Sequence, residues 1–190
     1  MTASLRFAPL VILGAVMLGA CGGSSSATKP AAPASTARAG AVPADATFVR
    51  HMLPHHLRAL QVGELAAQKG SDPRVRAFGR RIIAEQTPEE QRLARWVATL
   101  HVNRAPGDAM MADGYISDAT LARLRTESGP TFDHAFLVLS ARSETGAATM
   151  AQQELAGGTY GPARTLAASI AGAPHSEIPE LRALAASLPA

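Results

Sequence analysis

The sequence predicts an all-α fold, a four-helix bundle built from two similar helical hairpins. Apolar residues recur at helical spacing over long stretches, whereas sustained alternation of β-branched residues is nearly absent. A repeat with a shift of 88 positions relates the two halves of the predicted domain. Because each hairpin carries one apolar stripe, the two hairpins can bury these stripes only against each other.

The repeat runs without a gap through the predicted halves, at about 45–102 and 131–188. An ungapped register of this length indicates duplication more than coincidence. The positions that match are Asp45 with Asp133, Phe48 with Phe136, Ala59 with Ala147, Gly70 with Gly158, Ile82 with Ile170, Glu89 with Glu177, and Leu93 with Leu181.

Capping and breaking residues set the predicted helix boundaries in the first half. We expect helices over about 45–69 and 73–101. Asp45 can cap the first, and the Gly70–Pro73 turn ends it and starts the second. Pro88 should kink or break the second helix, because proline removes a backbone hydrogen bond.

The second half should repeat this hairpin after a connecting segment. A loop is expected over 103–116 and a short helix over 117–127, followed by helices over 132–156 and from Gly161 onward. Three residues should disturb the last helix: Gly172, Pro174 and Pro179.

The first 20 residues have the pattern of a secretion signal. The apolar run from Leu10 to Met17 is too short to span a bilayer. The segment that ends it, Leu18–Cys21, resembles the lipobox of bacterial lipoprotein signals, in which cleavage precedes a lipid-bearing cysteine. The resemblance implies that Cys21 anchors the chain to a cell-envelope membrane, on its periplasmic or extracellular face. The alternative is a chance cysteine after an ordinary signal.

Residues 21–44 are predicted to form a flexible tether between the lipid and a domain over 45–190. The tether consists mainly of Gly, Ser, Ala, Pro and Thr, which bury too little apolar surface to offset the entropy of ordering. The chain has a net charge of +3, one Trp and two Tyr, with scattered cations. We therefore expect no nucleic-acid partner, because such sites combine a basic stripe with stacking aromatics.

The segment that could bind a metal is His51–His56. His51 and His55 lie one helical turn apart, as do Met52 and His56. Imidazole and thioether together form a soft ligand set that suits copper, especially Cu(I).

Gln86 and Glu89 interrupt the apolar stripe of the facing helix. A buried carboxylate is costly unless it is paired or ligates an ion, so Glu89 is the expected partner of the histidines. The predicted copper ligands are His51, Met52, His55, His56 and Glu89. The competing interpretation is a histidine–glutamate hydrogen bond in the core, with no metal.

Several of these residues together resemble one family, that of the domain of unknown function 305. The resemblance covers about residues 45–188 and rests on Asp45, Phe48, Met52-x-x-His55-His56, Ala59, Ile82, Gln86-x-x-Glu89 and Trp96. It implies a ferritin-like bundle, often secreted or envelope-bound. It also implies copper binding, which in some members is associated with the Met-x-x-His-His motif.

The second half departs from this motif. Ser140, Ser143 and Glu144 stand where the first half has methionine and two histidines. We therefore expect one half-site, helped by Glu144 or His175, or a weakened metal role, and not two symmetric soft sites.

No enzymatic motif supports a catalytic function. The chain lacks the Glu-x-x-His pairs of di-iron oxidases, and it has no hydrolase, kinase or metalloprotease signature. The leading hypothesis is a non-catalytic lipoprotein that captures or buffers copper. The alternative is a metal-free helical interaction module on the membrane, and a redox enzyme with a single metal is a remote third.

Overall fold

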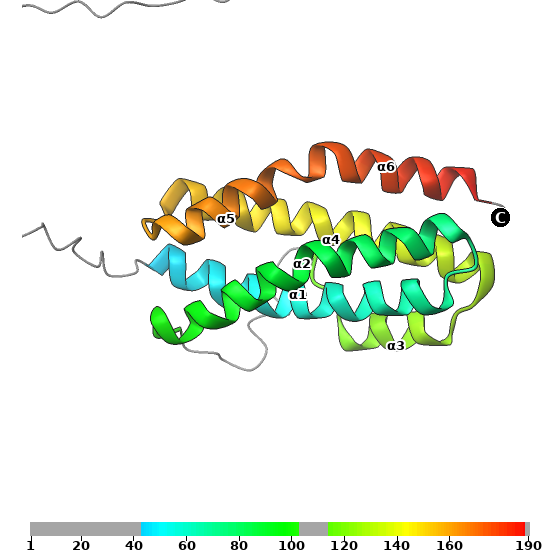
Figure 1. The fold of residues 1–190 in the computed structure, drawn as a ribbon, viewed down its shortest axis with the longest axis horizontal. Helices are drawn as coiled ribbons and strands as arrows, with labels where there is room; N and C mark the ends of the chain where they lie inside the picture. The colour runs from blue at the N-terminus through cyan, green and yellow to red at the C-terminus, as the bar shows by residue number, and fades with distance from the viewer. Residues whose placement is uncertain (1–42, 103–113, 189–190) are drawn as a thin grey trace, which may run out of the picture. The chain divides into compact units, whose positions relative to one another are not determined.

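A computed structural model describes residues 43–102 and 114–188 of the 190-residue chain. These residues form helices and no strand (Figure 1). The helices are α1 (Pro43–Lys69), α2 (Pro73–Thr99), α3 (Asp118–Thr126), α4 (Gly129–Gly157), α5 (Gly161–Gly172) and α6 (Pro174–Ser187). The predicted signal, the predicted tether before residue 43 and most of the predicted loop lie outside the described residues.

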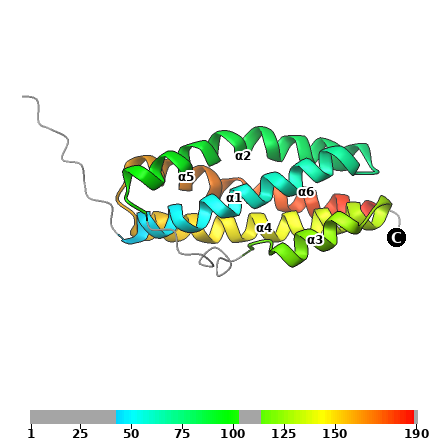
Figure 2. The ribbon, with the colours of Figure 1, turned by 90° about the horizontal axis from the view of Figure 1, so that it is seen from below.

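The helices form two hairpins that pack against each other. α1 pairs with α2, and α4 pairs with α5 and α6, which together take the place of a fourth long helix (Figures 1 and 2). α1 packs on α4 and joins the hairpins, while α3 packs on α4. The predicted four-helix bundle is confirmed, with its fourth helix in two pieces.

Pro88 and Pro179 lie inside helices and do not end them. Of the two outcomes predicted at Pro88, a kink or a break, the break does not occur, because α2 continues through Pro88 to Thr99. The Thr87 hydroxyl donates a 2.6 Å hydrogen bond to the carbonyl of Ile83, which adds a bond at the turn where proline lacks an N–H. Pro179 lies inside α6 and does not end it. The division of the fourth helix falls at residue 173 alone.

Two aspartates, one from each half, bind the turn of the opposite hairpin. Asp45 Oδ1 accepts hydrogen bonds from the backbone N–H groups of Thr159 and Tyr160, both at 2.9 Å. Asp133, its counterpart 88 positions on, accepts from the N–H groups of Ser71 (2.9 Å) and Asp72 (2.7 Å). The expectation that Asp45 caps α1 is therefore corrected, because α1 begins at residue 43 and this carboxylate bonds to the other hairpin.

An arginine pair also follows the repeat. Arg76 Nη1 donates to the carbonyl of Gly70 at 2.7 Å, and Arg164 Nη1 donates to the carbonyl of Gly158 at 2.9 Å. These arginines are again 88 positions apart. The two hairpin turns are thus held by the same side chains in the same way, which is the structural consequence of duplication.

A polar layer divides the apolar core into two clusters. One cluster contains Phe48, Met52 and Trp96, and the other contains Phe78 and Phe136. Between the two clusters, α1, α2 and α4 each carry buried or half-buried polar residues. Within the described part of the chain, no helix is both long and apolar enough to cross a membrane.

Candidate functional site

The polar layer is the part of the bundle where chemistry is concentrated. Its residues are His55 and His56 from α1, Gln86 and Glu89 from α2, and Ser140, Ser143 and Glu144 from α4. His55, His56 and Glu144 are only 2%, 1% and 8% exposed, respectively. Polar groups this deeply buried are costly unless each finds a partner.

His56 is held by the carboxylate of Glu89. The distance from His56 Nε2 to Glu89 Oε2 is 2.9 Å. If Nε2 carries the proton for this bond, Nδ1 keeps its lone pair. Nδ1 of His56 is buried, and no group of the described residues bonds to it. The carboxylate therefore orients the ring and leaves one nitrogen available as a ligand.

His55 has the same pattern with a neutral partner. Its Nε2 lies 3.2 Å from the hydroxyl oxygen of Ser143, which is its own counterpart in the second half. Its Nδ1 is also buried and has no partner among the described residues. Burial, and secondarily the neighbouring His56, lowers the pKa of His55 to about 3. The imidazole of His55 is therefore neutral at physiological pH.

Glu144, the counterpart of His56, is a buried carboxyl. Gln86 Nε2 donates a 3.0 Å hydrogen bond to Glu144 Oε1. Burial raises the pKa of Glu144 to about 8, with smaller contributions from Glu177, Glu89 and Glu85. At neutral pH this carboxyl is therefore mostly protonated.

A pocket of about 160 Å³ opens beside the polar layer. It brings together two pairs of counterparts, His56 with Glu144 and Glu89 with Glu177, so it lies where the two halves meet. Glu85 also lines it. Burial, followed by the charge of Glu85, raises the pKa of Glu177 above its ordinary value. The pocket thus combines one imidazole with four carboxyl groups.

The five predicted ligands are not all in one place. His56 and Glu89 meet, whereas His55 bonds to Ser143 and Met52 is fully buried in the apolar cluster of Phe48 and Trp96.

His51 lines a different pocket, together with Phe48, Met150 and Glu154. His175, a suggested helper, is exposed, and its Nδ1 lies 3.2 Å from the carbonyl of Gly172. Across residues 43–102 and 114–188, no three His, Cys, Asp or Glu side chains are arranged to hold a metal ion.

Glu85 and Glu177 line the pocket although neither was predicted as a site residue. The sequence could have indicated Glu177, because it is the counterpart of Glu89 in the 88-position repeat. No sequence feature indicated Glu85, since its position outside the apolar stripe is typical of a solvated helix face.

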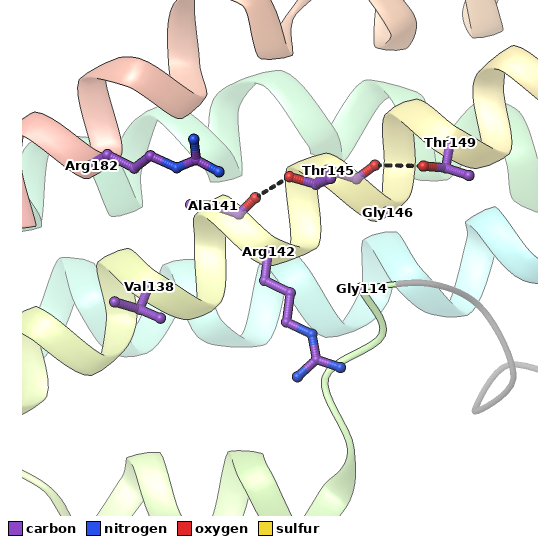
Figure 3. A pocket seen from close by; sticks show the side chains of 8 residues that line it. All are labelled: Gly114, Val138, Ala141, Arg142, Thr145, Gly146, Thr149 and Arg182. Atoms are coloured by element: carbon purple, nitrogen blue, oxygen red, sulfur yellow. Dashed lines mark hydrogen bonds between the residues drawn. The ribbon is translucent and has the colours of Figure 1, made fainter.

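The surface of α4 and α6 carries a larger pocket of about 460 Å³ (Figure 3). The hydroxyls of Thr145 and Thr149 there donate to backbone carbonyls of α4, at 2.8 and 3.0 Å. Arg142 extends toward the segment at Gly114, whereas Arg182 extends from α6 on the other side of α4 (Figure 3). These polar groups do not converge, so the smaller pocket at the polar layer is the better candidate.

The buried carboxyl of Glu144 leads to a prediction about stability and pH. Its pKa is raised on folding, so the folded state binds an extra proton between about pH 4.5 and 8 and loses stability as the pH rises through that window. Glu144→Gln, which keeps the acceptor for Gln86, should therefore be more stable than wild type at pH 8, by about 1–3 kcal/mol. The difference should vanish near pH 4.

Urea denaturation at pH 4.5 and at pH 8 measures this difference. Glu64→Gln is the control, because Glu64 is exposed on α1 and should show no such dependence. A Glu144→Gln variant with the pH dependence of wild type would show that Glu144 is not protonated at neutral pH.

Comparison with known proteins places this fold. The family model of the domain of unknown function DUF305 matches residues 45–185. A DUF305 fragment from Deinococcus radiodurans is 23% identical with a TM-score of 0.68, covering 77% of this chain and 97% of that chain. A DUF305 protein from Streptomyces coelicolor is 24% identical in sequence, with a TM-score of 0.67. The match covers 74% of this chain and 91% of that chain.

A third similar structure is CopM in its Cu(I)-bound form. It is 23% identical with a TM-score of 0.61, and the match covers 74% of this chain and 94% of CopM. No curated protein matches the chain significantly. At sequence identities this low, the solved structures show that the fold is shared. The match to the family model shows to which family the sequence belongs. The chain belongs to the DUF305 family, as its motifs predicted.

Proposed function

We propose that this protein is a non-catalytic metal-binding lipoprotein of the cell envelope, which captures or buffers copper. The observation that carries the proposal is the arrangement of His55 and His56. Both rings are buried, each is bonded through Nε2, and each has an Nδ1 with no bonded group among the described residues. Histidines that ligate metals are commonly held in this way by a hydrogen bond to the second nitrogen.

The chemistry of the donors fits a soft ion. His55 stays neutral because burial lowers its pKa to about 3, so protons do not compete for it at physiological pH. Met52 precedes His55 by three positions and His56 by four on α1, which places its sulfur near the same turn. In this proposal Met52, His55 and His56 are the ligands and Glu89 positions His56. His51 is outside the set, because it lines another pocket.

The fold adds support of a different kind. CopM, which has the same fold, has been solved with Cu(I), Cu(II) and Ag. Cu(I) is a d¹⁰ ion that accepts low coordination numbers, so two imidazoles and one thioether are sufficient ligands. Because these side chains do not already surround one point, uptake requires them to rearrange.

A metal-free interaction module is the second candidate. The three hydrogen bonds of the polar layer, His56–Glu89, His55–Ser143 and Gln86–Glu144, favour it. Such a layer can specify how helices align without binding any ion.

Titration of the full chain bearing Cys21→Ser with Cu(I), under reducing conditions, distinguishes the two candidates. The substitution removes a thiol that would itself bind Cu(I). The metal-binding proposal expects about one tightly bound ion per chain, since the second half lacks the motif. Weak binding at scattered sites would support the metal-free module.

The membrane anchor makes a separate prediction. Because one thioether at Cys21 would carry the lipid, Cys21→Ser should release the protein from membranes into the soluble envelope fraction. Fractionation of cells with a high-salt wash measures this release. A variant that stays in the membrane fraction after the wash would show that the lipoprotein assignment is wrong.

A further inference from the structure

Another buried carboxyl, that of Glu154, lies far along α4 from the polar layer. Glu154 is 1% exposed, and no N–H or O–H donor of the described residues reaches either of its carboxyl oxygens. Its carboxyl packs against Gly158, where an added Cβ would lie only 2.2 Å from Glu154 Oε1. Beside it is Asp45, whose carboxylate bonds to Thr159 and Tyr160 in the α4–α5 turn.

The internal repeat shows that the fold does not require this carboxyl. The counterpart turn between α1 and α2 is closed by Asp133 in the same way, and the residue at the position of Glu154 there is Ala66. A buried carboxyl without a donor costs stability. The copper site proposed above does not use it either. Glu154 therefore calls for an explanation other than folding.

Three titratable or charged groups lie near the Glu154–Asp45 pair: His51 on α1, and Tyr160 and Arg164 at the start of α5. Arg164 favours the ionised form of Glu154, but its guanidinium also bonds to backbone carbonyls of the turn. Burial, and then Asp45, raises the pKa of Glu154 to about 8, so the carboxyl is protonated at neutral pH.

We propose that Glu154 and Asp45 form a proton-dependent contact that holds the N-terminal end of α1 on the α4–α5 turn and releases it as the pH rises. In the protonated state Glu154 donates a hydrogen bond to the Asp45 carboxylate, which remains free to accept from Thr159 and Tyr160. Loss of the proton leaves two carboxylates side by side in a buried site. The contact would thus make one end of the bundle responsive to external pH.

Hydrogen exchange of the full chain bearing Cys21→Ser tests the proposal with an internal control. The amides of Thr159 and Tyr160 report the contact at Asp45, and those of Ser71 and Asp72 report the counterpart at Asp133. The ratio of the exchange rates at the two turns cancels the base catalysis of exchange, because this catalysis affects all amides. Between about pH 5 and 8 we expect the protection of Thr159 and Tyr160 to fall by up to about tenfold per pH unit relative to the counterpart turn, and to level off above about pH 8.

Two variants complete the test. Glu154→Gln should abolish the differential response, and Ala66→Glu should introduce it at the counterpart turn. Equal responses of the two turns in the Cys21→Ser chain would overturn the proposal, and this comparison does not depend on any variant at residue 154 folding. A differential response that persists in Glu154→Gln would also overturn it.

Discussion

His55→Ala and His56→Ala should each abolish most of the Cu(I) uptake of the Cys21→Ser chain, lowering its affinity on the order of 100-fold or more. Each substitution removes one of two adjacent buried imidazoles, whose Nδ1 atoms have no other partner among the described residues. Titration against a chelator that competes for Cu(I) measures the affinity of each variant.

Other variants separate ligation from packing. Met52→Leu keeps the volume and apolarity of a side chain buried in the core, so a loss of uptake there would come from the sulfur. Ser143→Ala removes only a neutral hydrogen bond to His55 and should cost less than about tenfold. His134→Ala and His175→Ala are matched controls, because both histidines are exposed. Equal, tight uptake by the control variants and by His55→Ala would end the copper hypothesis.

The metal-free alternative predicts a different result for the same variants. Removal of His56 leaves the Glu89 carboxylate without its imidazole partner, at a cost of about 1–3 kcal/mol. Stability would then fall in His56→Ala while copper binding stayed weak in all chains. Chemical denaturation and copper titration of one variant set therefore test both candidates.

The fold was predictable because its signals are long and repeated. Each hairpin has an apolar stripe at helical spacing, and the ungapped repeat implied that the halves pack as equivalents. Local rules alone did not decide whether Pro88 would kink α2 or break it. Packing of α2 on α1 keeps the helix continuous there, in spite of the missing backbone hydrogen bond.

The candidate site was predictable only in part, for a geometric reason. Successive residues of a helix point about 100° apart, so a run such as His51–His56 cannot direct every side chain to one place. His56 meets Glu89, as the facing stripes indicated, while His51 lies in another pocket. Glu177 enters the pocket because the fourth helix is divided between α5 and α6, and the sequence did not show how α6 would approach.

Asp133→Ala, a substitution away from the polar layer, should lower the free energy of unfolding by about 2–4 kcal/mol. The Asp133 carboxylate accepts from the backbone N–H groups of Ser71 and Asp72 and from the Ser71 hydroxyl. Alanine would leave these donors of the α1–α2 turn without partners and would also remove a bond between the two hairpins. Urea denaturation near pH 7 measures the loss.

Substitution of Asp133 measures the contribution of the aspartate–turn contact to stability with fewer side effects than substitution of Asp45. At the counterpart turn, removal of Asp45 would also take away the acceptor of the protonated Glu154, whereas the counterpart of Glu154 in the first half is Ala66, which has no polar side-chain group. Asp118→Ala is the control, because Asp118 is exposed and its surface ion pair with Arg58 should contribute less than about 1 kcal/mol. Should Asp133→Ala cost no more than Asp118→Ala, the aspartate contacts would not hold the hairpins together, and the apolar clusters alone would stabilise the bundle.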